Sequence, residues 1–135
     1  MLENYVYLYV EDDPLSREIM QTLMEKALEM KNLTMFSDSK DFGERLKALP
    51  TRPNVVLLDI HVEPHDGFSM LTMLRADPDF RDIKIIALTA SVMNDEVDKL
   101  RESGFDGAIG KPLSLQTFPD LLKRILDNEP IWNIA

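Results

Sequence analysis

Short apolar runs alternate along this chain with longer segments in which apolar residues recur every three or four positions. Runs rich in β-branched, aromatic and aliphatic residues predict strands, and the unbroken run Val55–Leu58 is typical of a strand buried on both faces. Strands that alternate with helices form a parallel sheet covered by helices on both faces. The sequence therefore predicts an α/β fold, a doubly wound parallel sheet of five strands with five helices. The expected strands are Tyr5–Val10, Leu33–Phe36, Val55–Leu58, Ile83–Leu88 and Ala108–Ile109.

The helices are predicted from apolar stripes and from residues that favour a helix start. Asp13 is expected to cap the first helix, because proline is favoured at the position that Pro14 then occupies. Asp66 is expected to cap the third helix, and Ser114 the fifth, which requires Pro119 to fall in its first turn. The positions expected to face the core are Leu15, Ile19, Leu23 and Ala27; Phe42, Leu46 and Leu49; Met70, Leu71 and Leu74; Val92, Met93, Val97 and Leu100; and Phe118, Leu121, Leu122 and Ile125.

The length of 135 residues predicts one domain, over residues 1–127, followed by a short tail over residues 128–135. Ile131, Trp132 and Ile134 of the tail are expected to cover part of the domain's own body. The eight methionines are expected mainly to fill the core. No apolar stretch approaches the length of a membrane helix, and acidic residues rather than a cleavage site follow the first apolar run. We therefore expect a cytoplasmic protein.

Composition excludes several kinds of chemistry and partner. The chain has no cysteine, which excludes disulfides, thiol catalysis and thiolate metal sites. Its 24 acidic and 15 basic side chains give a formal net charge of −9. Such a chain is repelled by nucleic acid backbones and by anionic membrane surfaces, so we expect no direct binding to either.

Polar residues follow four of the five predicted strands. Glu11 and Asp12 follow the first, Asp59 ends the third, Thr89 follows the fourth and Lys111 the fifth. In an open parallel sheet, ligands bind where the carboxyl ends of the strands meet. Three carboxylates against one lysine leave two excess negative charges, and oxygen ligands favour a hard cation such as Mg²⁺. A bound cation favours a phosphoryl group, which Thr89 and Lys111 can hold and which Asp59 can accept as an acyl phosphate.

Five short motifs stand in a fixed order relative to these strands. They are Val10-Glu11-Asp12-Asp13, Leu57-Leu58-Asp59, Asp66-Gly67, Leu88-Thr89-Ala90 and Lys111-Pro112. In this the chain resembles the receiver domain of two-component response regulators, from Tyr5 to about Leu126. The resemblance implies a flavodoxin-like strand order, 2-1-3-4-5, and a cis Lys111–Pro112 bond.

The resemblance also implies a set of roles. Asp59 accepts a phosphoryl group from a phosphohistidine on a sensor histidine kinase or a histidine phosphotransfer protein. Asp12 binds Mg²⁺ directly, Glu11 acts through water, and the backbone carbonyl of His61 supplies a further ligand. The side chains of Thr89 and Lys111 and the amide of Ala90 contact the phosphoryl oxygens. The side chains of His61 and Ser91 flank the approach of the water that removes the group and are expected to control dephosphorylation.

Two positions depart from the family pattern. The proline usually found four residues after the phosphorylated aspartate is displaced by one residue, since position 63 is Glu and the proline is Pro64. The ring usually found three residues before the lysine is replaced by Ala108. We therefore expect activation to travel through the loop after Thr89 and the start of the fourth helix.

The leading functional prediction is a stand-alone phosphoacceptor switch, not a turnover enzyme, that signals by contact with a downstream protein or by passing the phosphoryl group on. Its oligomeric state is open between a monomer and a phosphorylation-dependent dimer. A degenerate receiver that binds partners without phosphorylation is the main alternative. A haloacid-dehalogenase-like phosphatase would need an aspartate where His61 stands, and a flavodoxin-like carrier would need a phosphate loop where Glu11, Asp12 and Asp13 stand. A transition-metal site formed by His61 and His65 with Asp59, Glu63 and Asp66 is disfavoured, because the spacing matches no zinc motif. The two histidines are instead expected to be solvent-facing loop residues.

Overall fold

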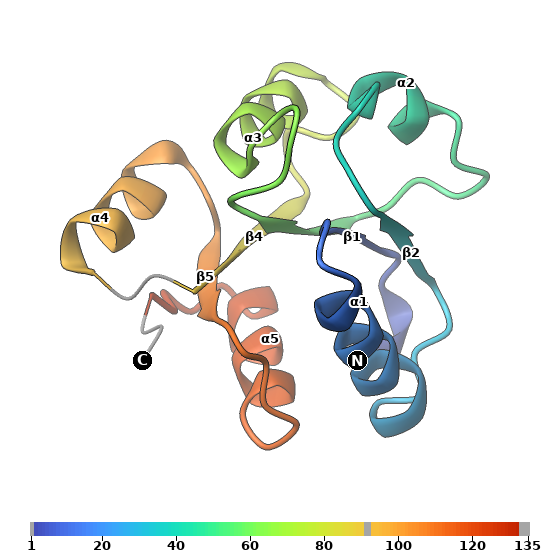
Figure 1. The fold of residues 1–135 in the computed structure, drawn as a ribbon, viewed down its shortest axis with the longest axis vertical. Helices are drawn as coiled ribbons and strands as arrows, with labels where there is room; N and C mark the ends of the chain where they lie inside the picture. The colour runs from blue at the N-terminus through green and yellow to red at the C-terminus, as the bar shows by residue number, and fades with distance from the viewer. Residues whose placement is uncertain (1, 91–92, 133–135) are drawn as a thin grey trace.

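Five parallel strands form a single sheet in the order β2-β1-β3-β4-β5, which confirms the predicted doubly wound fold (Figure 1). The computed structural model describes residues 2–90 and 93–132, without the side chains of Glu3 and Ala27. The strands are β1 (Tyr7–Val10), β2 (Leu33–Phe36), β3 (Val55–Asp59), β4 (Lys84–Thr89) and β5 (Gly107–Gly110). The α-helices are α1 (Pro14–Gln21), α2 (Phe42–Lys47), α3 (Gly67–Ala76), α4 (Asn94–Ser103) and α5 (Phe118–Leu126). A 3₁₀-helix, η1 (Leu2–Asn4), precedes β1, and a π-helix, η2 (Thr22–Ala27), continues α1.

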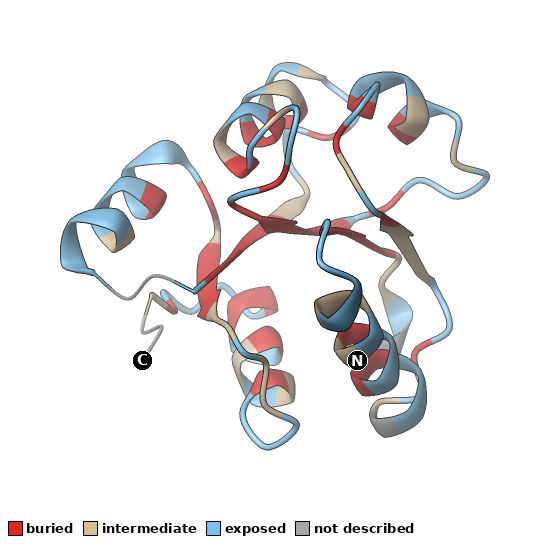
Figure 2. Ribbon diagram, in the orientation of Figure 1, coloured by how far each residue is buried: buried red, intermediate tan, exposed pale blue. Residues whose placement is uncertain are grey.

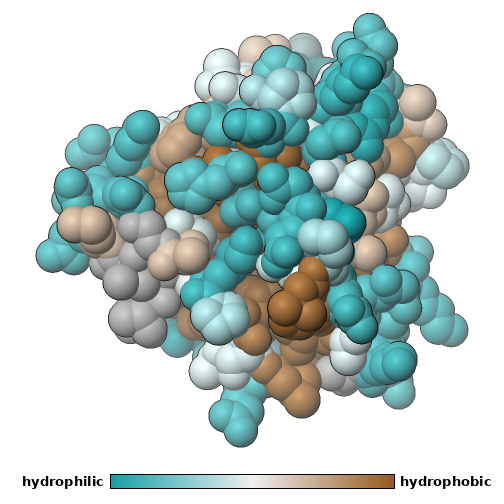
Figure 3. All heavy atoms as spheres, in the orientation of Figure 1, coloured by the Kyte–Doolittle hydropathy of each residue, from teal (hydrophilic) through white to brown (hydrophobic). Residues whose placement is uncertain are grey.

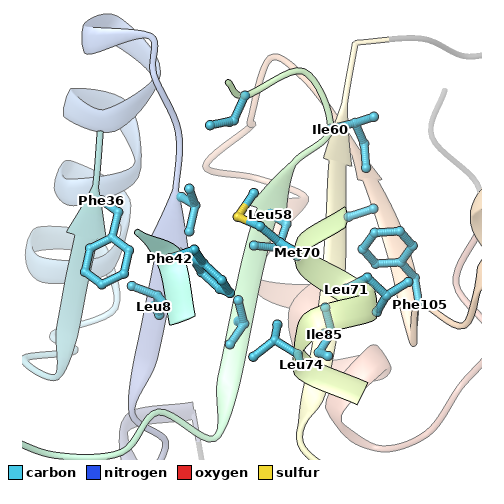
Figure 4. Packing of buried hydrophobic residues seen from close by; sticks show 14 of the residues in the cluster. Leu8, Phe36, Phe42, Leu58, Ile60, Met70, Leu71, Leu74, Ile85 and Phe105 are labelled. Atoms are coloured by element: carbon cyan, nitrogen blue, oxygen red, sulfur yellow. The ribbon is translucent and has the colours of Figure 1, made fainter. Parts of the chain in front are cut away.

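Two apolar clusters, one on each face of the sheet, form the core. Helices α1 and α5 cover one face, and α2 and α3 cover the other (Figure 1). Side chains alternate between the faces along each strand, so Leu8 and Val10 belong to the α2–α3 cluster while Tyr7 and Tyr9 belong to the α1–α5 cluster. Strands β1 and β3 are buried along their whole length, the edge strand β2 is half-buried except at Phe36, and the helices are buried mainly on the side facing the sheet (Figure 2). Figure 4 shows the α2–α3 cluster, in which Phe42, Met70 and Leu74 from the helices pack on Leu8, Leu58 and Ile85 from the strands.

The register of the strands aligns their carboxyl ends. Val10 pairs with Leu58 and Asp59 pairs with Leu88, so the residue after β1 lies next to the last residue of β3. Thr89 pairs with Gly110, which places the residue after β5 at the same edge. The residues that follow β1, β3, β4 and β5 therefore meet at one edge of the sheet, as the sequence predicts.

Two of the three predicted helix caps are confirmed and one is wrong. The Asp13 carboxylate accepts a hydrogen bond from the Ser16 amide at 3.1 Å, and the Asp66 carboxylate accepts one from the Ser69 amide at 2.8 Å. Ser114 does not cap α5, which begins at Phe118. Its hydroxyl oxygen instead accepts a hydrogen bond from the Gln116 amide in the turn before the helix. Pro119 falls in the first turn of α5, where its missing N–H has no helical partner to lose.

The predicted core positions are correct for most helices but wrong at two residues. Leu15 and Met93 are each 62% exposed. Leu15 begins a stripe spaced by four, which overshoots a turn of 3.6 residues by about 40° at each step and so drifts around the helix. The predicted Leu23 is buried, and Met20 and Met24, which were not predicted, share its buried face. Met93 precedes α4 rather than lying on its inner face, and Val92, Ala27 and Ile134 fall outside the described residues or side chains.

The described part of the tail packs on the domain, as expected. Ile131 is 6% exposed, and its carbonyl oxygen accepts a hydrogen bond from the Ala108 amide of β5 at 3.0 Å. Trp132 is half-buried against the α2–α3 cluster, and the Arg101 guanidinium lies 5.5 Å from the centre of its ring. Over residues 2–90 and 93–132, none of the helices has the length and apolar character needed to cross a bilayer.

Gly67 is the residue where α3 packs most closely on β3. A Cβ at this position would lie 2.8 Å from Ile60 Cδ1 and 3.0 Å from Ile60 Cα, whereas one at Gly43 would meet nothing within 4 Å. We expect Gly67→Ala to lower the free energy of unfolding by about 1–3 kcal/mol, because the backbone after Asp59 must move. Gly43→Ala in α2 should be neutral or stabilise by up to about 1 kcal/mol. Urea unfolding measures both, and equal stability of the two variants would contradict this packing.

Candidate functional site

Three carboxylates meet at the carboxyl edge of the sheet. Glu11 and Asp12 follow β1 and Asp59 ends β3, and one oxygen of each lies within 4.8 Å of the others. Glu11 and Asp59 are buried, at 0% and 5% exposure, while Asp12 is exposed. The structure thus brings together the three acids predicted from the sequence, with Asp12 on the side open to solvent.

Lys111 joins the end of β5 to these acids. Its Nζ lies 2.6 Å from Glu11 Oε1 and 3.5 Å from Asp59 Oδ1. Its amide donates to the Thr89 carbonyl at 2.8 Å, which ties the loop after β5 to the end of β4. The Lys111–Pro112 peptide is cis, as the sequence resemblance implies.

Burial and mutual repulsion dominate the electrostatics of the cluster. Burial raises the pKa of the Glu11 carboxyl, and its hydrogen bond with Asp59 raises that pKa further, although the hydrogen bonds from Lys111 and Tyr9 oppose the shift. Burial lowers the pKa of the Lys111 ammonium, but its hydrogen bond to Glu11 and the charge of Asp59 outweigh this and raise it. The cluster therefore holds Lys111 charged while its carboxylates repel one another. An oxygen-only donor set with uncompensated negative charge fits a hard divalent cation such as Mg²⁺.

The remaining predicted residues surround the acids. Thr89 is buried at the end of β4, and Ala90 follows it on the surface. His61 is exposed two residues after Asp59 and lines, together with Thr89 and Lys99, a cavity of about 150 Å³. Ser91, expected to act with His61, lies outside the described residues.

The loop after Asp59 is held by a serine that the sequence analysis did not identify. The Ser39 hydroxyl donates to the His65 carbonyl and accepts from the His65 amide, both at 2.7 Å, and the Ser39 amide donates to the Glu63 carbonyl at 3.2 Å. Ser39 is fully buried, and the Glu63–Pro64 peptide in this loop is cis. The displaced proline therefore stands in a loop that is anchored at two backbone positions.

The alternative metal site at the loop histidines is not supported. Within the part of the chain that the structure describes, Glu11, Asp12 and Asp59 are the single group of three or more metal-binding side chains close enough to share an ion. His61 is exposed, His65 is half-buried, and Asp66 caps α3. Both histidines are loop residues, as expected, but only His61 faces the solvent, since His65 is half-buried.

Tyr9 and Arg17 also contact the site and were missed from the sequence. The Tyr9 hydroxyl donates to Glu11 Oε1 at 2.9 Å, and burial together with the Glu11 charge raises the pKa of this phenol. The Arg17 guanidinium donates to the Glu11 backbone carbonyl at 2.8 Å. The alternation of a strand places Tyr9 on the same face as Glu11, so its position contained a signal. No sequence pattern marked Arg17 as a residue of the site, apart from its place in the first turns of α1.

Comparison with known proteins agrees with this geometry. The family model described as "Response regulator receiver domain" matches residues 7–125. The chain belongs to the receiver domain family of response regulators. This receiver domain is 32% identical, over 75 residues, to the polar-differentiation response regulator DivK of Brucella anthropi. The aligned part covers 56% of this chain and 61% of that protein, so the chain spans less than two thirds of the length of this relative.

Solved structures share its fold. The signal receiver domain of a DNA-binding response regulator from Colwellia psychrerythraea is 24% identical, with a TM-score of 0.77 over 91% of this chain and 98% of that one. The receiver domain of the sensor histidine kinase PA1611 from Pseudomonas aeruginosa, solved with a magnesium ion in its active-site cleft, is 23% identical, with a TM-score of 0.76 over 91% and 98% of the two chains. Both show that this receiver domain has the fold of its family.

The acid cluster predicts a weak Mg²⁺ site that depends on Asp12. Asp12→Ala should weaken Mg²⁺ binding by at least roughly 10- to 100-fold, since that is the loss when a residue that only supports a metal ligand is removed, and Asp12 is expected to bind the ion directly. Asp98→Ala, which removes an exposed acid from α4, makes the same change in net charge and should bind as wild type does. Isothermal titration calorimetry measures both. Equal affinities in wild type and Asp12→Ala would remove Asp12 from the site.

Mg²⁺ affinity should rise with pH through the raised pKa of Glu11. Because burial raises the pKa of Glu11, a proton stays on the buried acids at pH values where an exposed glutamate has lost it, and that proton competes with the cation. Without metal, the folded state binds more protons than the unfolded state in this window, so stability should fall as pH rises through it. Calorimetry between about pH 5 and pH 8 tests the affinity, and the dependence should flatten in Glu11→Gln. If the pH dependence of Mg²⁺ affinity is unaltered in Glu11→Gln, the competing proton is held by a group other than Glu11.

Proposed function

We propose that this receiver domain accepts a phosphoryl group on Asp59 from a phosphohistidine of a sensor histidine kinase or a histidine phosphotransfer protein. The observation that carries the proposal is the placement of the Asp59 carboxylate, which ends a buried strand 3.5 Å from the Lys111 ammonium and within 4.8 Å of two further carboxylates. A carboxylate in such a place is a nucleophile whose product, an acyl phosphate, has a cation beside it. The domain acts as a switch and not as a turnover enzyme.

In the proposed step, an Asp59 oxygen forms a bond to phosphorus while the phosphorus–nitrogen bond of the phosphohistidine breaks. The imidazole nitrogen leaves with the electron pair. Asp12 and Asp59, Glu11 and the backbone carbonyl of His61 would hold Mg²⁺, which when bound offsets the charge of the phosphoryl oxygens. The Lys111 ammonium, the Thr89 hydroxyl and the Ala90 amide hold those oxygens once the group is on Asp59.

The transfer changes the balance of charge around Lys111. In the unmodified protein its ammonium lies closer to Glu11 than to Asp59. A phosphoryl group on Asp59 adds negative charge and draws the ammonium away from Glu11. Because the Lys111 amide donates to the Thr89 carbonyl, this movement is coupled to the loop after β4 and to the start of α4. Ala108 lacks the ring used elsewhere in the family, so we assign the output to this loop and to the contacts of α4 with a downstream protein.

We assign to His61 the control of how long the phosphoryl group stays on Asp59. Its side chain is exposed two residues after Asp59 and lines the cavity beside Thr89, so it can orient or block the attacking water. Ser91 is the expected second residue on that path.

The phosphohistidine must arrive on a protein, and an apolar groove lies beside the site. Figure 3 shows brown side chains gathered on the surface between α1 and α5. The groove is lined by Leu15, Ile19, Leu23, Leu113 and Leu115 among others, and Leu15 and Leu115 are 62% and 61% exposed. Leu15 stands three residues after Asp12 and Leu113 two after Lys111, so a surface docked here reaches the carboxyl edge of the sheet. We assign the groove to the phosphodonor protein.

Incubation with acetyl phosphate and Mg²⁺, followed by intact mass, tests the proposed transfer. Wild type should gain the mass of one phosphoryl group, and Asp59→Asn should gain none because the amide is not a nucleophile toward phosphorus. Asp66→Asn is the matched control, since Asp66 caps α3 and should leave the transfer intact. The same samples followed over time report the lifetime, which should change several-fold in His61→Ala.

Two outcomes would oppose the proposal. If wild type gains no phosphoryl group, the domain is a degenerate receiver that binds its partners without phosphorylation. If Asp59→Asn gains the group as readily as wild type, the acceptor is another residue. A change in sedimentation on phosphorylation separates a phosphorylation-dependent dimer from a monomer.

A further inference from the structure

The Tyr9 hydroxyl lies in the core beneath the acid cluster, on the face of the sheet that α1 and α5 cover. Tyr9 lies on β1, between β2 and β3, with an exposure of 0%, and its ring belongs to the α1–α5 cluster. A phenylalanine would fill the same space and bury the same ring. The hydroxyl, however, donates to Glu11 Oε1 at 2.9 Å, so this tyrosine contacts a residue of the site through its one polar atom.

Glu11 shares one oxygen between two donors. Oε1 accepts from the Tyr9 hydroxyl at 2.9 Å and from the Lys111 ammonium at 2.6 Å, while Oε2 accepts from the Asp13 amide at 3.4 Å. Glu11 is completely buried, so water does not reach its side chain to replace a lost donor. A buried carboxylate that loses its partners is strongly disfavoured. Any movement of Lys111 toward Asp59 therefore carries a cost that is set by what else holds Glu11.

We propose that Tyr9 is a positioning residue that keeps Glu11 Oε1 hydrogen-bonded when Lys111 moves to the phosphoryl group on Asp59. This inference rests on the proposed function, since it concerns the same transfer. With the Tyr9 hydroxyl in place, Glu11 Oε1 still accepts a hydrogen bond after Lys111 has moved away. Without it, Lys111 is the main donor to that oxygen and is held there, in competition with the phosphoryl group. Tyr9 contacts neither Asp59 nor the phosphoryl oxygens in this scheme and acts through Glu11.

The chain offers a matched control two residues earlier. Tyr7 lies on the same strand and the same face, is also 0% exposed, and belongs to the same cluster. Its hydroxyl donates to the Leu2 carbonyl at 2.7 Å, at the opposite end of β1 from the acids. Tyr7→Phe and Tyr9→Phe therefore remove the same atom from the same core, and they differ in whether that atom contacts Glu11.

The first measurement uses the unmodified protein without metal. Hydrogen exchange of the Lys111 ammonium, followed by NMR of ¹⁵N-lysine-labelled protein, reports how firmly Lys111 is held by Glu11. Exchange should slow several-fold in Tyr9→Phe and remain unchanged in Tyr7→Phe. Equal exchange in Tyr9→Phe and wild type would overturn the inference, whatever the result with phosphodonors.

The second measurement is the rate of phosphorylation by acetyl phosphate with Mg²⁺. Tyr9→Phe should be slower by roughly tenfold, the effect of one hydrogen bond to a buried charge, and Tyr7→Phe should match wild type. In a Glu11→Gln background, Tyr9→Phe should change the rate by less than about twofold, because the group through which it acts has been altered. A tenfold effect that persists in that background would show that Tyr9 acts through core packing and would overturn the inference.

The two measurements separate the two hypotheses. If wild type accepts no phosphoryl group, the proposed function fails, while ammonium exchange still decides whether Tyr9 competes with Lys111 for Glu11. If wild type is phosphorylated and Tyr9→Phe matches it in both measurements, the proposed function stands and the role of Tyr9 fails. Similar melting temperatures for Tyr7→Phe and Tyr9→Phe are expected, since each loses one buried hydroxyl.

Discussion

The ion pair between Glu11 and Lys111 connects the end of the first strand to the loop after the last strand, across 100 residues of sequence. It joins two elements that lie on either side of β3 and β4 in the sheet order, and it passes beside the phosphoacceptor candidate, Asp59. The carboxylate is wholly buried, so its charge must be met by protein donors. The arrangement of the site follows from this requirement. The Tyr9 hydroxyl and the Lys111 ammonium both donate to the buried Glu11 carboxylate, while Asp12 remains exposed to solvent.

The sequence predicted the features that depend on local patterns or on the rules of parallel sheets. Val55–Leu58 is apolar at every position because β3 is central and covered on both faces, and the run identified the strand directly. Asp13 and Asp66 were identifiable as caps because a cap bonds to a backbone group three residues away. The meeting of Glu11, Asp59 and Lys111 followed from the common edge at which parallel strands end. Their detailed roles in phosphotransfer are still proposals.

What the sequence did not reveal depends on single contacts between distant residues. Ser39 fixes the loop after Asp59 through His65, 26 residues away, and an isolated serine in a polar loop has no pattern that marks such a contact. Leu15 was wrongly predicted to face the core. An apolar residue in the first turn of a helix can fit the spacing of a buried stripe even where the helix does not lie on the sheet. The exposure of Leu15 instead contributes to the groove beside the site. The residue that was wrongly predicted to lie in the core thus lines a surface groove that the packing of the fold does not require.

The hydrogen bond between the Ala108 amide and the Ile131 carbonyl has a consequence for how this sheet can meet other chains. β5 is one of the two edge strands, and an edge strand offers unpaired backbone groups to any extended segment that approaches. Here the returning chain takes up one of those groups, and Pro130 beside it has no N–H to extend a ladder. Ile131 therefore stands where an extended segment would pair with Ala108. At this position the domain's own chain, and not a partner, therefore ends the continuation of the sheet.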